Sequence, residues 1–139
     1  MVKSYDPKQV AVIFRGNIIH GFADSTFILA ERNEQAFNQK VGVDGEGTRA
    51  KSNNKSGKVT ITLMNSSDSN DVLSAAAAAD ELSGKGTGSL VVNDKSGRTV
   101  IAAATAWVQK IANAEMAKEA NNRVWVLETD ELDMFVGGN

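Results

Sequence analysis

The sequence contains no cysteine, and it has one proline and one histidine among its 139 residues. Without cysteine the chain has no disulfide bond, thiol nucleophile or thiolate metal ligand. A zinc site would need several carboxylates around the single histidine, His20, and no such spacing occurs. His20 lies between Ile19 and Gly21 and is interpreted as an ordinary strand residue. We therefore predict no catalytic residue, no metal and no cofactor, and expect that the chain is not an enzyme.

No charge of one sign dominates the sequence. It has 15 Lys and Arg against 17 Asp and Glu, a net charge of -2 and a pI near 5.4, so no overall basic field holds nucleic acid tightly. The longest apolar run, Val100 to Val108, is too short to span a bilayer. The first nine residues lack the apolar core of a signal peptide. We expect a chain made in the cytoplasm without membrane insertion, and its length predicts a single domain over residues 1–139.

Since proline is nearly absent, turns must be made by Gly, Asn, Asp and Ser. These residues separate short segments in which apolar and polar side chains alternate, as in half-buried strands. A polar N-terminal arm (1–9) precedes them, and Gly16-Asn17 is a candidate two-residue hairpin turn. The strands expected are Val10–Arg15, Ile18–Phe22, Phe27–Arg32, Ala36–Val43, Lys58–Met64, Ser89–Asn93, Arg123–Thr129 and Leu132–Val136. The pattern predicts a mainly β fold, a sandwich or barrel of short antiparallel strands.

One α-helix is expected, over about residues 71–83, flanking this sheet. Asn70 or Asp68 can cap its start, and Gly84 can end it. Its apolar stripe is shallow because it consists mainly of alanine, so the helix can approach the sheet closely. The side chains expected to pack on the sheet are Val72, Ala75, Ala76, Ala79 and Leu82.

A Gly- and Lys-rich segment, 42–57, is expected to form a long loop. Its carboxylates, Asp44 and Glu46, are turn residues that do not form an acid–base pair. A basic cluster follows them without interleaved aromatic rings, unlike a nucleic-acid groove. A solvated loop and a contact with an acidic partner surface are both compatible with the cluster, which consists of Arg49, Lys51, Lys55 and Lys58.

The segment Thr99 to Asn122 is ambiguous. Its content of Ala, Lys and Glu favours a helix by propensity. Two strands, about Thr99 to Thr105 and Ala106 to Ala112, followed by a polar loop, are the alternative, because neighbouring strands can override propensity.

Several segments, in this order, resemble a known family. They are the early hairpin VIFRGNIIHGFAD, the DGE-containing loop at Asp44, the strand, cap and helix GKVTITLMNSSDSNDVLS, then LVVNDKSGRTV and the closing VWVLETDELDMFVGG. From about Val10 to Gly138 the chain resembles the tail tube proteins of contractile-tailed bacteriophages. No single motif is diagnostic, since the resemblance lies in the order of the elements.

The resemblance implies hexameric rings with a continuous inner β-barrel, stacked into a tube whose lumen conducts DNA without sequence-specific binding. It implies that the 42–57 loop reaches the neighbouring ring, and it favours strands over Thr99 to Ala112. The residues expected at this inter-ring or subunit contact are Asp44, Glu46, Arg49, Lys51, Lys55 and Lys58. The Ala-rich stretch from Ala112 to Ala120 departs from the family pattern, and an extra helical turn is expected there. The implied partners are further copies of the chain, a sheath protein, and tape-measure and baseplate or terminator proteins. The implied location is the virion, after assembly in the host cytoplasm. We expect a polar and acidic lumen, because a basic one would retain DNA.

Two other functions remain open at this point. The same chain could build the tube of a contractile injection apparatus, of the secretion-system or bacteriocin type. Alternatively, it could be a small monomeric binding module whose lysine-rich loop grips an acidic ligand.

Overall fold

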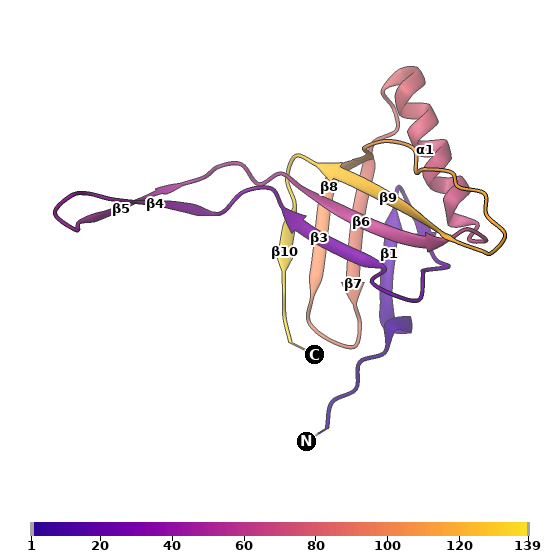
Figure 1. The fold of residues 1–139 in the computed structure, drawn as a ribbon, viewed down its shortest axis with the longest axis horizontal. Coiled ribbons are helices and arrows are strands. Elements are labelled where there is room, and N and C mark those ends of the chain that lie inside the picture. The colour runs from indigo at the N-terminus through magenta and orange to yellow at the C-terminus, as the bar shows by residue number, and fades with distance from the viewer. Residues whose placement is uncertain (1, 139) are drawn as a thin grey trace.

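The computed structural model describes residues 2–138, so Met1 of the predicted arm and Asn139 lie outside the described residues. The described residues form ten strands, one α-helix and one short 3-10 helix, which lies at the end of the arm (Figure 1). In chain order they are η1 (Pro7–Gln9), β1 (Val10–Phe14), β2 (Asn17–Ile19), β3 (Ile28–Arg32), β4 (Phe37–Val41), β5 (Gly47–Lys51), β6 (Gly57–Met64), α1 (Ser69–Ser83), β7 (Gly88–Asp94), β8 (Val100–Val108), β9 (Asn122–Thr129) and β10 (Asp133–Phe135). The mainly β, antiparallel class with one flanking helix is confirmed.

Eight strands form one open antiparallel sheet in the order β2-β1-β7-β8-β9-β6-β3, with β10 paired to β8. The residues of β8 are shared between two halves of this sheet. Val100 to Ala103 pair with β7, and Ala106 to Val108 pair with β9. The sheet therefore folds over at β8, and β3, β6 and β9 cross β1 and β7 obliquely (Figure 1). The barrel alternative is wrong for the single chain, because β2 and β3 leave the sheet open within residues 2–138.

The hydrophobic core lies between the two layers. Strand β6 shows why the sequence folds this way: Val59, Ile61 and Leu63 are fully buried, while the residues between them face outward. Trp125 and Leu127 of β9 continue this inner face, and Phe14, Leu90 and Ile101 are among the core residues of the opposite layer. The alternation read from the sequence is thus the alternation between core and solvent.

The first hairpin turns one residue earlier than expected. Phe14 pairs with Asn17, so Arg15 and Gly16 form the two-residue turn. Both have positive φ, 53° and 79°, as a primed turn requires. Gly16-Asn17 as the turn is therefore wrong, since Asn17 is already the first residue of β2.

The ambiguous segment from Thr99 is a single strand, β8, followed by a loop. Neither the helix nor a break into two strands is present, and Ala112 to Ala120 forms no helical turn. Strand pairing on both sides of β8 outweighs the helix propensity of its alanines. Ile101 and Ala103 are buried in the core, and after a one-residue register shift Ala106 and Val108 are buried there too.

Helix α1 begins at Ser69 and ends at Ser83, and the next residue, Gly84, has a φ of 70° and provides the expected left-handed cap. Neither Asp68 nor Asn70 caps the first turn of the helix with its side chain, contrary to the prediction from the sequence. Asp68 makes no side-chain cap hydrogen bond, and Asn70 instead accepts a 2.9 Å bond from Trp125 Nε1. The Ser67 hydroxyl accepts from the Ser69 N–H at 3.2 Å. The bond between Trp125 and Asn70 joins the start of the helix to β9 across the core.

The buried face of α1 is rotated from the expected stripe. Its buried residues are Ser69, Leu73, Ala76 and Ala77. Of the predicted packing residues, Ala76 is buried and Val72 is partly buried against the core, whereas Ala79 is only half-buried and Ala75 is exposed. Leu82 is 91% exposed, so its expected packing on the sheet is wrong. The C-terminal end of the helix projects above the sheet (Figure 1).

Candidate assembly surfaces

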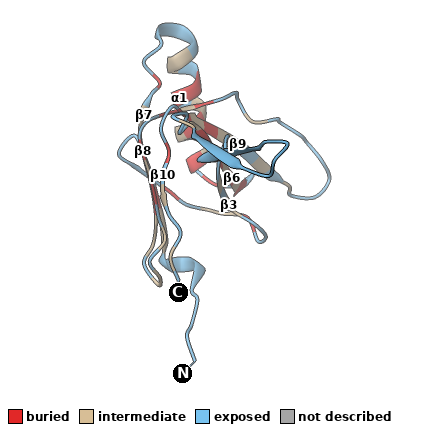
Figure 2. Cartoon of the chain, turned by 90° about the vertical axis from the view of Figure 1, so that its left-hand side faces the viewer, coloured by how far each residue is buried: buried red, intermediate tan, exposed pale blue. Residues whose placement is uncertain are grey.

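The segment 42–57, predicted as a long loop, contains the turn and the second strand, β5, of a β-hairpin, followed by the connection to β6. Strands β4 and β5 pair from Phe37 opposite Lys51 to Val41 opposite Gly47, and form a sheet of their own. The hairpin continues the β3–β6 pair and projects from the sandwich as a long ribbon (Figure 1). All ten of its strand residues are exposed, and the hairpin is pale blue in Figure 2.

The two carboxylates predicted as turn residues, Asp44 and Glu46, lie in the turn between β4 and β5. Gly42 N–H donates to the Glu46 carbonyl at 2.8 Å, and Gly45 has a φ of 90°. The Asp44 carboxylate accepts from the Glu46 N–H at 3.2 Å. Asp44 therefore stabilises the turn itself. The Asp44-Gly45 pair is a hairpin signal that could have indicated β5 from the sequence alone.

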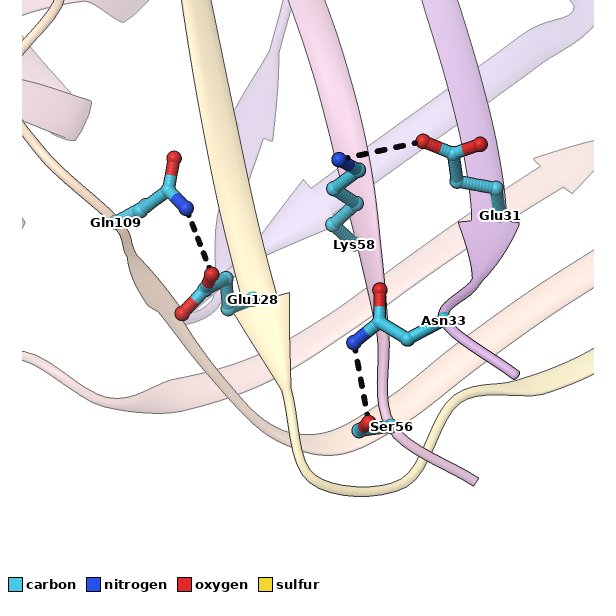
Figure 3. Close-up of polar contacts among 6 residues, drawn as sticks. All are labelled: Glu31, Asn33, Ser56, Lys58, Gln109 and Glu128. Atoms are coloured by element: carbon cyan, nitrogen blue, oxygen red, sulfur yellow. Dashed lines mark hydrogen bonds and ion pairs between the residues drawn. The ribbon is translucent and has the colours of Figure 1, made fainter. Parts of the chain in front are cut away.

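The base of the hairpin is fixed by side chains of small polar residues. The Ser52 hydroxyl donates to the Glu34 carboxylate at 2.8 Å, and the Ser52 N–H donates to the Ala36 carbonyl at 2.8 Å. Asn33 Nδ2 donates to Ser56 Oγ at 3.0 Å (Figure 3). These contacts set the direction in which the ribbon leaves the sandwich.

The basic cluster predicted from the sequence is divided by the structure. Arg49 and Lys51 lie on β5, and the Arg49 guanidinium stands over the Phe37 ring at 4.1 Å. Lys55 lies between β5 and β6, where its backbone carbonyl accepts from the Leu132 N–H at 2.8 Å. Lys58 belongs to β6 and forms an ion pair with Glu31 at 3.5 Å. Only Arg49 and Lys51 of the four are carried outward by the hairpin strands.

Lys58 is part of a charged row on the outer face of the β3-β6-β9 layer. Glu31 is opposite Lys58, Lys58 is opposite Glu128, and Gln109 Nε2 donates to Glu128 at 2.7 Å (Figure 3). Both side chains of the ion pair are about half exposed, so the pair contributes at most about 1 kcal/mol to stability.

The outer face of the other layer is apolar. Ile18, Ile13, Val91 and Ala102 are successive cross-strand neighbours over β2, β1, β7 and β8. Ile18 is 68% exposed. Ile13, Val91, Val100 and Phe135 on the same layer are also exposed large hydrophobic residues. A patch of this kind typically marks an interaction site, and sequence reasoning did not find it because the row crosses four strands that are not all adjacent in sequence.

His20 contributes to the fold through its backbone. Its N–H donates to Ser69 Oγ at 2.9 Å, and its carbonyl accepts from Ser67 Oγ at 2.6 Å. Gly21 has no room for a side chain, because a Cβ would lie 2.5 Å from Ser67 Oγ. The imidazole is exposed, and His20 directly follows the last residue of β2, one position beyond the strand in which it was expected.

Clustered metal ligands and a membrane-spanning helix are both absent from residues 2–138. Residues 2–138 contain no group of three or more His, Cys, Asp or Glu side chains placed to hold a metal ion. None of the helices described is both long and apolar enough to cross a membrane. The prominent features are exposed strand edges, an apolar sheet face and a projecting hairpin.

The fold is similar to that of two solved tube-terminating proteins. The chain is similar to the sheath/tube terminator of the extracellular contractile injection system PVC, with a TM-score of 0.63 and 9% identity over 97% of this chain and 99% of that one. It is likewise similar to the tube-terminating cap of the anti-feeding prophage, with a TM-score of 0.60 and 9% identity over 97% and 93% of the two chains. At these identities the likeness shows the fold.

Family membership comes from the sequence comparison. The chain belongs to the Bacteriophage PhiTE tail tube protein family, whose model matches residues 16–137. It is also 27% identical to the structural protein ORF10 of Pseudomonas phage KPP10, over 98% of this chain and 83% of that protein. The resemblance to phage tail tube proteins is therefore confirmed, and the family is one of structural proteins and not of enzymes.

Proposed function

We propose that this chain is the subunit of a phage tail tube. Six copies form a ring, the sheets of the ring form a continuous inner barrel, and stacked rings enclose a lumen through which DNA enters the host cell. The chain is a virion component in this proposal, built in the host cytoplasm, with sheath, tape-measure and baseplate or terminator proteins as partners. Its described residues act as one tail-tube domain that carries the N-terminal arm and the hairpin.

The projecting β4–β5 hairpin is the observation that carries this proposal. An isolated two-stranded hairpin is at best marginally stable in water, and this one meets no other strand of its own chain within residues 2–138. Another copy of the subunit would supply the missing contact. A contact between unlike surfaces of identical copies repeats from copy to copy, which builds rings and stacks.

The open sheet supports the same proposal. Strands β2 and β3 end the sheet, and exposed strand edges associate with other strands unless they are protected. Closing these edges between neighbouring copies would complete a barrel that the single chain does not close. The net charge of -2 suits a duct for DNA, since a basic wall would retain the polyanion.

A tube terminator is the second candidate, because both solved structures to which the chain is similar are described as a terminator or cap. The two functions differ in one property. A tube subunit adds rings without limit, whereas a terminator forms one ring and stops growth. The tube of a contractile injection apparatus remains the alternative within the first candidate, and association with a packaged genome separates the two.

Negative-stain microscopy of the purified protein tests these functions, with sedimentation velocity as the solution measurement. We expect tubes of variable length. Single rings at every concentration would favour the terminator, and a monomer at high concentration would overturn both in favour of a binding module.

The role of the hairpin is tested by excising residues 37–51 and joining Ala36 to Ser52 through a Gly-Asn turn. These two residues are already hydrogen-bonded neighbours, so the sandwich is expected to fold normally. We expect a folded subunit that no longer forms tubes. A matched excision of residues 113–118 from the exposed loop before β9 serves as the control, and normal tubes from the hairpin variant would contradict the role.

A further inference from the structure

A groove opens between the two layers of the sandwich at the edge strand β3. Ile28 and Ala30 of β3 form one wall, and Ile101 and Met134 of β8 and β10 contribute to the other. Its volume is about 650 Å³. The groove exists because β3 ends the sheet, so within the described chain no further strand covers the core at this side.

The groove is apolar inside and negative at its rim. Two carboxylates, Asp24 and Asp94, line it, and no Lys or Arg is among its described lining residues. Asp94 also accepts bonds from the backbone and hydroxyl of Ser96, at 3.0 and 2.7 Å, whereas Asp24 lies exposed in the β2–β3 connection. An occupant that fits these walls has apolar side chains flanked by cations.

One face of the β4–β5 hairpin has this composition. Residues directly opposite in an antiparallel pair lie on the same face, so Phe37 shares a face with Lys51, and Gln39 shares it with Arg49. Val41 extends the apolar part of that face. The reverse face, which carries Asn38, Lys40, Thr48 and Ala50, is polar or small, and the acidic residues of the hairpin are confined to its turn.

The hairpin projects away from its own sandwich, on a ribbon fixed at its base (Figure 1). An intermolecular contact is therefore favoured over occupation of the groove of the same chain. The free edge of β3 runs along the groove, and an added strand at such an edge can gain main-chain hydrogen bonds.

We propose that this groove, which we call the β3 groove, receives the β4–β5 hairpin of a second copy of the chain. Phe37 and Val41 lie against its apolar walls, and Arg49 and Lys51 face Asp24 and Asp94. The proposal rests on the proposed function, in which the hairpin contacts a neighbouring subunit, and it adds the receiving surface and the charges that select it. The contact joins unlike surfaces, so every copy both gives a hairpin and receives one.

Charge reversal tests the pairing. Asp24→Arg and Arg49→Glu are each expected to raise the protein concentration needed for tube formation by about tenfold, because each places like charges opposite one another. The double variant is expected to recover most of the loss, and so is an equimolar mixture of the two single variants. Glu119→Arg, a matched reversal in the exposed loop before β9, is expected to leave assembly unchanged.

Cross-linking directly tests whether the hairpin lies in the β3 groove. The chain has no cysteine of its own, so only the introduced cysteines can form a disulfide. Copies carrying Thr26→Cys, in the groove, are mixed with copies carrying Gln39→Cys, on the hairpin, and oxidised during assembly. We expect a covalent dimer in the mixture at several times the yield of either variant alone. A mixture of Thr26→Cys with Glu119→Cys is the control.

The outcomes separate this inference from the proposed function. Tubes with the cross-link and with charge rescue support both. Normal tubes without the cross-link, unaffected by Asp24→Arg, overturn the β3 groove and leave the tube intact. Cross-linked pairs that never grow into tubes support the groove and contradict the tube, and a chain that forms neither tubes nor cross-links contradicts both.

Discussion

Strands β6 and β4 have the same secondary structure and different surroundings. In β6 every second side chain is buried, and Val59, Ile61 and Leu63 have no exposed surface. In β4 all five side chains are exposed, including Phe37 at 41%. Strand geometry is therefore not what stabilises this molecule. The sandwich is stabilised by burial between its layers, whereas the hairpin buries little within its chain and is available to another copy.

The largest effect is expected from a charge in the sandwich core under α1. Leu73→Asp places a carboxylate where the side chain is fully buried among apolar residues, and an unpaired buried charge costs several kcal/mol. We expect loss of the folded state, seen as loss of the near-UV circular dichroism signal and of a cooperative urea transition. Leu82→Asp on the same helix is the control, because Leu82 is 91% exposed, and equal damage from both would contradict the helix orientation.

A methyl group at Gly86 is expected to have the next largest effect. Gly86 is buried after α1, and a Cβ there would lie 2.2 Å from the Ala76 carbonyl oxygen and 2.5 Å from Asp80 Cβ. We expect Gly86→Ala to reduce the free energy of unfolding by roughly 1–3 kcal/mol, the usual cost of overpacking. Urea denaturation measures it, and Gly47→Ala in the hairpin, where the nearest atom is a flexible side chain at 3.2 Å, is the matched variant. Unchanged stability of Gly86→Ala would show that α1 packs more loosely than described.

A smaller effect is expected from the hydrogen bond that joins α1 to β9. Trp125→Phe keeps most of the buried ring but removes the Nε1 donor, which leaves Asn70 Oδ1 without this bond. The free energy of unfolding should fall by about 1 kcal/mol, the low end for a lost buried hydrogen bond, because Asn70 is only partly buried. Val124→Phe on the exposed face of the same strand is expected to change stability little, and the opposite ranking would contradict the placement of Trp125 in the core.

The smallest effect on the isolated subunit is expected in the hairpin. Phe37→Ala removes the ring under the Arg49 guanidinium, and an exposed cation–π contact contributes about 0.5–1 kcal/mol to local order. The global urea midpoint should stay unchanged, since the hairpin forms its own sheet, while tube formation weakens. A clear drop in the subunit's midpoint would show that the hairpin is part of the cooperative fold, and would remove the distinction between the two regions.

The sequence predicted the helix, and it predicted those strands that have one apolar face and one polar face. Alternation in β6 and β9 and the glycine at the end of α1 are local signals, and each led to the observed element. It missed β5, whose residues Gly47 to Lys51 have no apolar face to alternate. It also left β8 undecided, because alanine favours a helix locally and only the neighbours on both sides make this segment a strand.

The residues proposed for assembly show the same division. The sequence placed Arg49, Lys51, Lys55 and Lys58 in one cluster because they are close in number. The structure separates Lys58, which pairs with Glu31 on the sandwich, from Arg49, which lies over Phe37 on the hairpin. The β3 groove has no sequence signal, since Asp24, Ile28, Ile101 and Met134 come from distant segments.

The sequence by itself determined the mainly β class, the helix, the strand alternation and membership of the tail tube family, because these depend on local patterns and on their order along the chain. The tertiary structure decided which face of α1 is buried, where β8 bends between two layers, and which surfaces are left uncovered. These features depend on contacts between residues far apart in sequence, and a local pattern cannot specify which distant segment will cover a given side chain.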